Sequence, residues 1–98
     1  MILDMDKTTG ELKISGTLDI DATNSLRDAL LDCLLHQPEV GVDLSEVDAC
    51  DAAALQILFA ARRDSAAAGK AFRATASEAV TGVAEALGLS FGEDARAN

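Results

Sequence analysis

Residues 42–58, VDLSEVDACDAAALQIL, decide the predicted fold. The apolar run ending at Leu44 predicts a short buried strand, the acidic residues after it predict a turn, and Asp51 predicts the N-cap of a helix. A helix that begins here presents unpaired backbone N–H groups, where an anion or the acidic groups of a partner bind readily. We therefore expect the functional site at this junction.

On the N-terminal side of this stretch, residues 2–5 and 12–16 flank a polar turn that ends in Gly10, which predicts a β-hairpin. A helix capped by Asp21 or Thr23 follows, and it ends before Pro38 because proline disfavours helical geometry in the preceding residue. Its apolar face has helical three-and-four spacing: Leu26, Ala29, Leu30, Cys33 and Leu34.

On the C-terminal side, the helix after Asp51 is expected to run to about Ala68, with Gly69 as its C-cap. A weaker strand is predicted at 71–75, and Ser77 then caps a last helix that Gly88 ends. The buried stripe of the helix after Asp51 is predicted to consist of Leu55, Leu58, Phe59 and the aliphatic stem of Arg62.

The predicted order after the hairpin is helix, strand, helix, strand, helix. Strands separated by helices of this length require a mixed or mostly parallel sheet with right-handed crossovers, so the fold class is α/β. A chain of 98 residues is the size of one domain. We expect a single domain over 1–98, with residues 93–98 as a frayed tail because none of them is apolar and larger than alanine.

The charge and composition restrict the partners. A net charge of −9 argues against nucleic acid or anionic lipid and favours a basic protein surface. No apolar run is long enough to cross a bilayer and the N-terminus does not resemble a signal peptide, so we expect a cytoplasmic protein without membrane insertion. Cys33 and Cys50 lack metal-ligand spacing and are expected to be free thiols, and no metal or other cofactor is expected.

Three groups of residues resemble the STAS domain family, named for sulfate transporters and anti-sigma factor antagonists. Residues 51–55, Asp-Ala-Ala-Ala-Leu, resemble the Asp-Ser-Ser-Gly-Leu-like motif that opens a helix in that family. Residues 16–19 look like its Gly-x-Leu-Asp, and residues 87–89 look like its closing Leu-Gly-Leu. The order and spacing of these pieces are more specific than any one of them.

The resemblance implies a four- to five-stranded mixed sheet with helices packed mainly on one face. It also implies a non-enzymatic bacterial regulator of transcription or signalling that binds an anti-sigma factor or other histidine-kinase-like ATPase. Related single domains act beside chemotaxis kinases or as subunits of lipid-transport ATPases, and fold alone does not choose among these roles. Ala52 occupies the phosphoacceptor position and Ala53 that of the second serine, so the usual serine switch is expected to be missing.

The expected partner-binding surface consists of six residues near the junction: Asp19, Asp21, Asp48, Asp51, Ala52 and Ala53. Loops that follow neighbouring parallel strands emerge at the same end of a sheet, which places these residues together. Two simpler interpretations stay open. Asp51 can act only as a helix cap, and the other carboxylates can form a solvated acidic rim.

Enzymatic activity has little support in the sequence. The single histidine, His36, is placed at a helix C-terminus, and no serine has a nucleophile-elbow context. Cys50 lies beside a helix start, which lowers a thiol pKa, but the neighbouring carboxylates oppose that effect and favour an inert thiol. We therefore expect no catalytic residues. An enzyme or small-ligand binder ranks third, after the regulator of an ATPase and the subunit of a larger assembly, and only the helix start, where an anion can bind, supports it.

Overall fold

The structure is a computed structural model that describes residues 1–6 and 8–89. The predicted frayed tail, residues 93–98, lies outside the described residues. The elements follow in the order β1 (Ile2–Met5), β2 (Glu11–Leu18), the 3-10 turn η1 (Ile20–Ala22), α1 (Thr23–His36), β3 (Val40–Cys50), α2 (Ala52–Ala67), β4 (Phe72–Ala76) and α3 (Glu78–Ala86).

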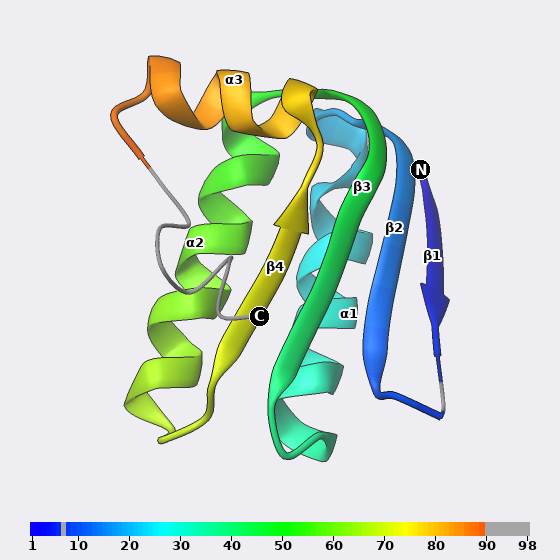
Figure 1. Cartoon of the computed structure of the whole chain (residues 1–98), viewed down its shortest axis with the longest axis vertical. Coiled ribbons are helices and arrows are strands. Elements are labelled where there is room, and N and C mark those ends of the chain that lie inside the picture. The colour runs from blue at the N-terminus through cyan, green and yellow to red at the C-terminus, as the bar shows by residue number, and fades with distance from the viewer. Residues whose placement is uncertain (7, 90–98) are drawn as a thin grey trace.

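The four strands form one mixed sheet in the order β1-β2-β3-β4. β1 pairs with β2 antiparallel, while β2 with β3 and β3 with β4 are parallel pairs. Helices α1 and α2 make the two crossovers and lie against one face of the sheet, and α3 crosses the end at which β4 finishes (Figure 1). The predicted α/β fold with a four- to five-stranded mixed sheet and helices mainly on one face is confirmed.

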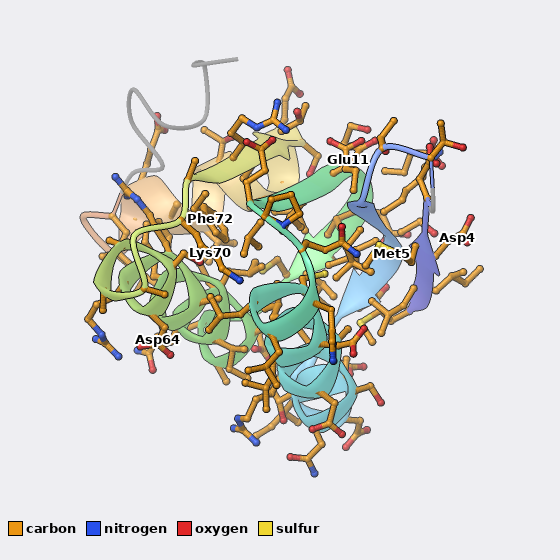
Figure 2. All side chains as sticks on the ribbon, turned by 90° about the horizontal axis from the view of Figure 1, so that it is seen from below. Asp4, Met5, Glu11, Asp64, Lys70 and Phe72 are labelled. Carbon is orange, nitrogen blue, oxygen red and sulfur yellow. The ribbon has the colours of Figure 1, made fainter. Side chains whose placement is uncertain are left out.

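Alternation along the strands separates the two faces of the sheet. The row Met5, Leu12, Val42 and Ala74 runs across the sheet on the helix side, and the neighbouring row Asp4, Lys13, Asp43 and Thr75 points the other way. Figure 2 shows Met5 and Phe72 on the inner side and Asp4 pointing outward. Because side chains alternate with a period of two, one face carries the core and the other remains polar.

The strand β3 is longer than predicted, and the expected acidic turn after Leu44 is part of it. Between Lys13 and Ser15 of β2 the paired residues of β3 advance from Asp43 to Glu46, which leaves one extra residue in β3. A second shift, between Gly16 and Thr17, passes over Asp48. These β-bulges let an acidic, turn-like sequence stay in a strand, because each bulge accommodates a residue that has no partner opposite it.

The entry to α1 also differs from the prediction, because neither Asp21 nor Thr23 caps this helix. Its N-cap position is Ala22, which makes no side-chain hydrogen bond. The chain enters through η1 instead, where the Asp19 carboxylate accepts a hydrogen bond from the Asp21 backbone N–H at 3.1 Å. The 3-10 turn leads directly into α1, so the capping carboxylate acts before the helix rather than at its first residue.

The remaining helices end within a residue or two of the predicted positions, although Ala68 rather than Gly69 is the C-cap of α2. Gln37 is extended after α1, as expected before Pro38. Gly69 and Gly88 have φ of +72° and +73° directly after the C-caps of α2 and α3. The Ser77 hydroxyl caps α3 by accepting from the Val80 N–H at 3.3 Å, and it donates to the Val47 carbonyl at 2.7 Å. Ser77 thereby ties α3 to β3.

The prediction of the buried stripe of α2 is confirmed for Leu55 and Leu58, which have no exposed surface. Phe59 was expected beside them but is only half-buried, and the guanidinium of Arg62 lies 6.0 Å from the centre of its ring. The helix instead buries Ala54 and Ser65, and the Ser65 hydroxyl donates to a backbone carbonyl of its own helix. Small residues thus bring α2 close to its neighbours.

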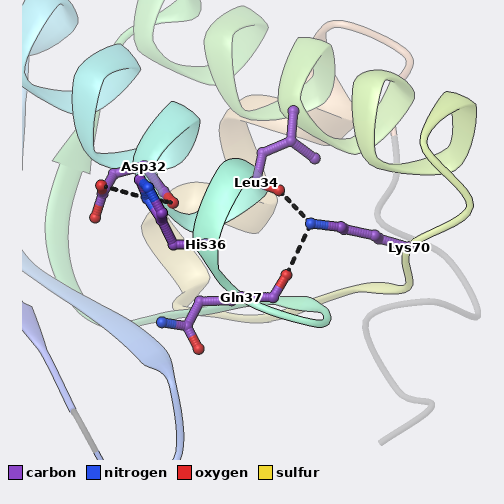
Figure 3. Close-up of polar contacts among 5 residues, drawn as sticks. All are labelled: Asp32, Leu34, His36, Gln37 and Lys70. Carbon is purple, nitrogen blue, oxygen red and sulfur yellow. Dashed lines mark hydrogen bonds and ion pairs between the residues drawn. The ribbon is translucent and has the colours of Figure 1, made fainter.

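Lys70, between α2 and β4, binds backbone carbonyls at the C-terminal end of α1. Its ammonium group donates to the backbone carbonyls of Leu34 and of Gln37, the latter at 2.9 Å (Figure 3). The last carbonyls of a helix have no partner within the helix, and they carry the negative end of its dipole. The ammonium group of Lys70, from a distant part of the chain, therefore supplies hydrogen bonds to these carbonyls and a positive charge beside the negative end of the dipole.

We predict that Leu58→Ala lowers the free energy of unfolding by about 2–5 kcal/mol, because it leaves a cavity in a site with no exposed surface. Urea unfolding followed by circular dichroism measures this change. Leu35→Ala is the matched control: Leu35 is 64% exposed on α1, so its truncation should change stability by no more than about 0.5 kcal/mol. Equal midpoints for both variants would contradict the placement of α2 on the core.

We predict that Lys70→Met destabilises the protein by about 1–3 kcal/mol, because two helix-terminal carbonyls lose a charged donor while the apolar stem is kept. Lys13→Met is the control, since Lys13 makes an exposed ion pair with Glu46 at 2.9 Å and its loss should matter much less. The two variants are compared by urea unfolding. Coincident curves would show that the Lys70 contact contributes no more than a surface ion pair.

Candidate functional site

The start of α2 is built as the sequence predicts. Asp51 is extended, with φ −98° and ψ 170°, and its carboxylate accepts a hydrogen bond from the Ala54 N–H at 3.1 Å. The Asp51 backbone N–H donates to the carbonyl of Leu18 at 2.9 Å. Asp51 therefore does cap the helix, and its backbone joins the start of α2 to the end of β2.

The structure brings the six predicted residues to one end of the sheet. Leu18 and Cys50 are paired at the ends of β2 and β3, so the segments that follow them emerge side by side. Asp19 and Asp21 belong to the segment after β2, and Asp51, Ala52 and Ala53 to the segment after β3. The three carboxylates Asp19, Asp21 and Asp48 are exposed, while Asp51 and the two alanines are half-buried.

Asp48 does not share a face with the other five residues. Its carboxylate accepts a hydrogen bond from the Thr17 hydroxyl at 2.9 Å. Thr17 directly precedes the fully buried Leu18, so the two side chains lie on opposite faces of β2. The bulge at Asp48 thus directs this carboxylate toward the polar face of the sheet, and the proposed surface bends around the end of the sheet.

An apolar groove, which the sequence reading missed, adjoins the start of α2. It has a volume of about 630 Å³ and lies between α1 and α2. Ile20 and Ala53 line one end of it, and Leu31, Leu34 and Ile57 line its length. A signal was present in the sequence, because Leu31 directly follows the buried Leu30 and widens the apolar face beyond the stripe that the core needs.

Cys50, beside the site, has a thiol whose pKa is raised by its surroundings. Burial raises the pKa of the Cys50 thiol, and the Asp51 carboxylate raises this pKa further. The thiol donates a long hydrogen bond to the Asp51 carbonyl at 3.4 Å. Since the thiolate is the reactive species, this environment agrees with the predicted inert thiol and does not suit a nucleophile.

The one histidine of the sequence lies at the other end of α1 from the predicted site. His36 is in the last turn of α1, where its Nδ1 lies 2.9 Å from the Asp32 carboxylate (Figure 3). No group of three metal-ligating side chains occurs within residues 1–6 and 8–89. In the same part of the chain, none of the helices has the length and apolar character needed to cross a membrane.

Comparison with known proteins identifies the family of this chain. No curated protein matches the chain with significant similarity. A family model described as "Mlab, STAS domain" matches residues 1–90. STAS domains are in general binding and regulatory domains rather than enzymes, and they imply interaction with other proteins. The match confirms the resemblance of the sequence, and the chain belongs to the STAS domain family.

Proposed function

We propose that residues 1–98 form one cytoplasmic, non-enzymatic regulatory domain that binds an anti-sigma factor or another histidine-kinase-like ATPase. The binding surface comprises Asp19, Asp21, Asp48, Asp51, Ala52 and Ala53. The observation that carries the proposal is the start of α2, where the two half-buried methyl groups of Ala52 and Ala53 lie at the same end of the sheet as the exposed carboxylates of Asp19 and Asp21. Such a mixture of small apolar and charged groups suits a docking surface.

The charge of this surface indicates the character of the partner. The chain has a net charge of −9, and the carboxylates of Asp19 and Asp21 are exposed beside the start of α2. Carboxylates at a rim steer a basic partner toward the surface and disfavour an acidic one. The proposal therefore predicts that association slows as the salt concentration rises.

A second candidate function is favoured by the two alanines. A regulator that is switched by phosphorylation needs a hydroxyl where this chain has Ala52 or Ala53. A constitutive subunit of a chemotaxis assembly or of a lipid-transport ATPase needs no such switch. Both candidates use the same surface, and identification of the bound partner separates them.

We predict that Ala53→Arg weakens partner binding at least about tenfold, because a long charged side chain replaces a half-buried methyl group at the docking surface. The partner is first captured from native lysate, identified, and then titrated in purified form. Ala67→Arg is the matched control, since it adds the same charge to the exposed far end of α2 and should bind normally. Circular dichroism checks that both variants fold. Normal binding by Ala53→Arg together with a loss in variants of α3 would refute the assigned surface.

We predict that the wild-type protein is not phosphorylated by its cognate kinase, because neither Ala52 nor Ala53 offers a hydroxyl. Ala52→Ser should accept phosphate, and the added charge beside Asp48 and Asp51 should then weaken partner binding. Mass spectrometry after incubation with kinase and ATP measures the modification. Ser45 is the test of a displaced switch, since it is exposed in β3. Phosphate on the wild type that disappears in Ser45→Ala would mean that the switch has moved rather than vanished.

A further inference from the structure

We infer that the groove between α1 and α2 receives an amphipathic helix of the ATPase partner, with apolar residues seated in the groove and basic residues beside its acidic end. This inference rests on the proposed function, because it assigns a second part of the same docking surface. It specifies the secondary structure and charge of the partner segment, which the surface around Asp51 alone does not.

The groove exposes more apolar surface than the core requires. Ile20 is 67% exposed and Leu31 is 50% exposed, and both line the groove. Leu34 and Ile57 also line the groove and are half-buried. Contiguous exposed apolar side chains on a soluble domain mark interaction surfaces. A groove bounded by two helices suits the apolar face of a third helix, whose anchors recur every three to four residues.

The groove is continuous with the proposed docking surface. Ala53 belongs to both, and Ile20 lies between Asp19 and Asp21 in η1. Along α2 the wall continues with Ala60 and Ala61, whose short side chains let a partner helix approach closely. A partner that contacts the start of α2 can therefore extend one helix along the groove without leaving the protein surface.

The exposed carboxylates at one end of the groove favour a basic helix. Asp19 and Asp21 are exposed beside Ile20 at one end, and Asp64 lines the groove farther along α2, on the outer side of that helix (Figure 2). Among the described residues, Arg27 is the one basic residue in the lining of this groove, and it donates to the Asn24 side chain at 3.0 Å. Lysine or arginine on the partner helix would be attracted to this end. A second copy of the chain would bring another charge of −9, which disfavours self-association here.

Two double variants test the inference. Ile20→Gln/Leu31→Gln removes the exposed apolar groups of the groove, and Ile2→Gln/Leu35→Gln removes groups that are 68% and 64% exposed elsewhere. The probe is a fluorescent synthetic helix of roughly 18 residues, or five turns, with leucine on one face and lysine on the other. A matched peptide carries glutamate in place of lysine. Binding to the full chain is measured by fluorescence anisotropy.

We expect the lysine peptide to bind the wild type and the control double variant equally, and the groove double variant at least about tenfold more weakly. The glutamate peptide should bind less well than the lysine peptide, and added salt should reduce that difference. Equal binding of the lysine peptide to both double variants would overturn the inference, as would equal affinity for the two peptides. A wild-type dimer in sedimentation that the groove double variant loses would also overturn it, because a second copy would then fill the groove.

The captured ATPase separates this inference from the proposed function. If Ala53→Arg loses the ATPase while the groove double variant keeps it, the docking surface stands and the helix-binding groove is wrong. If both variants keep the ATPase, the proposed docking surface is wrong, and the assignment of the groove as a helix-binding site is refuted as well. Loss of the ATPase in both variants, with retention in the Ile2→Gln/Leu35→Gln control, supports the inference.

Discussion

The parallel pairing of β3 with a neighbour on each side is the constraint on which the rest of the structure depends. The chain moves from β2 to β3 to β4 in one direction across the sheet, and right-handed crossovers then place both connecting helices on the same face. This arrangement sets α1 beside α2 and creates the groove between them. It also brings the segments after β2 and β3 to the same end, where η1 and the start of α2 meet.

Local signals in the sequence were sufficient for most of the fold. The carboxylate of Asp51, the hydroxyl of Ser77 and the glycine at 69 act within one or two turns of chain, so their roles could be predicted without knowledge of the tertiary structure. The extension of β3 through Asp48 could not, because an acidic segment becomes a strand only when β2 lies beside it. Phe59 was misjudged since helical periodicity does not define how wide the buried stripe is.

The candidate site also has features that could be predicted from the sequence and features that depend on the tertiary structure. Its six residues were placed at one end of the sheet by a rule about parallel strands, and the structure has them there. The separation of Asp48 from the others depends on a bulge and on the Thr17 hydroxyl, which are properties of the pairing between strands. The groove was missed because its lining comes from η1, α1 and α2, and the surface that Leu31 shares with Ile20 and Ile57 exists only when the two helices lie side by side.

The buried position of Cys33 makes its thiol a probe of how often α1 separates from the sheet. Its side chain has no exposed surface, and burial, followed by the nearby Asp32 carboxylate, raises the pKa of the thiol. A thiol reagent in the solvent can reach this sulfur only after α1 has moved off the sheet, so its rate of modification measures how often that happens. Cys50 is half-buried at the junction of β3 and α2. A smaller, local opening should therefore be enough to expose its sulfur. The modification rate of Cys33 therefore reports the large openings of the fold, and the modification rate of Cys50 reports the small openings at the start of α2.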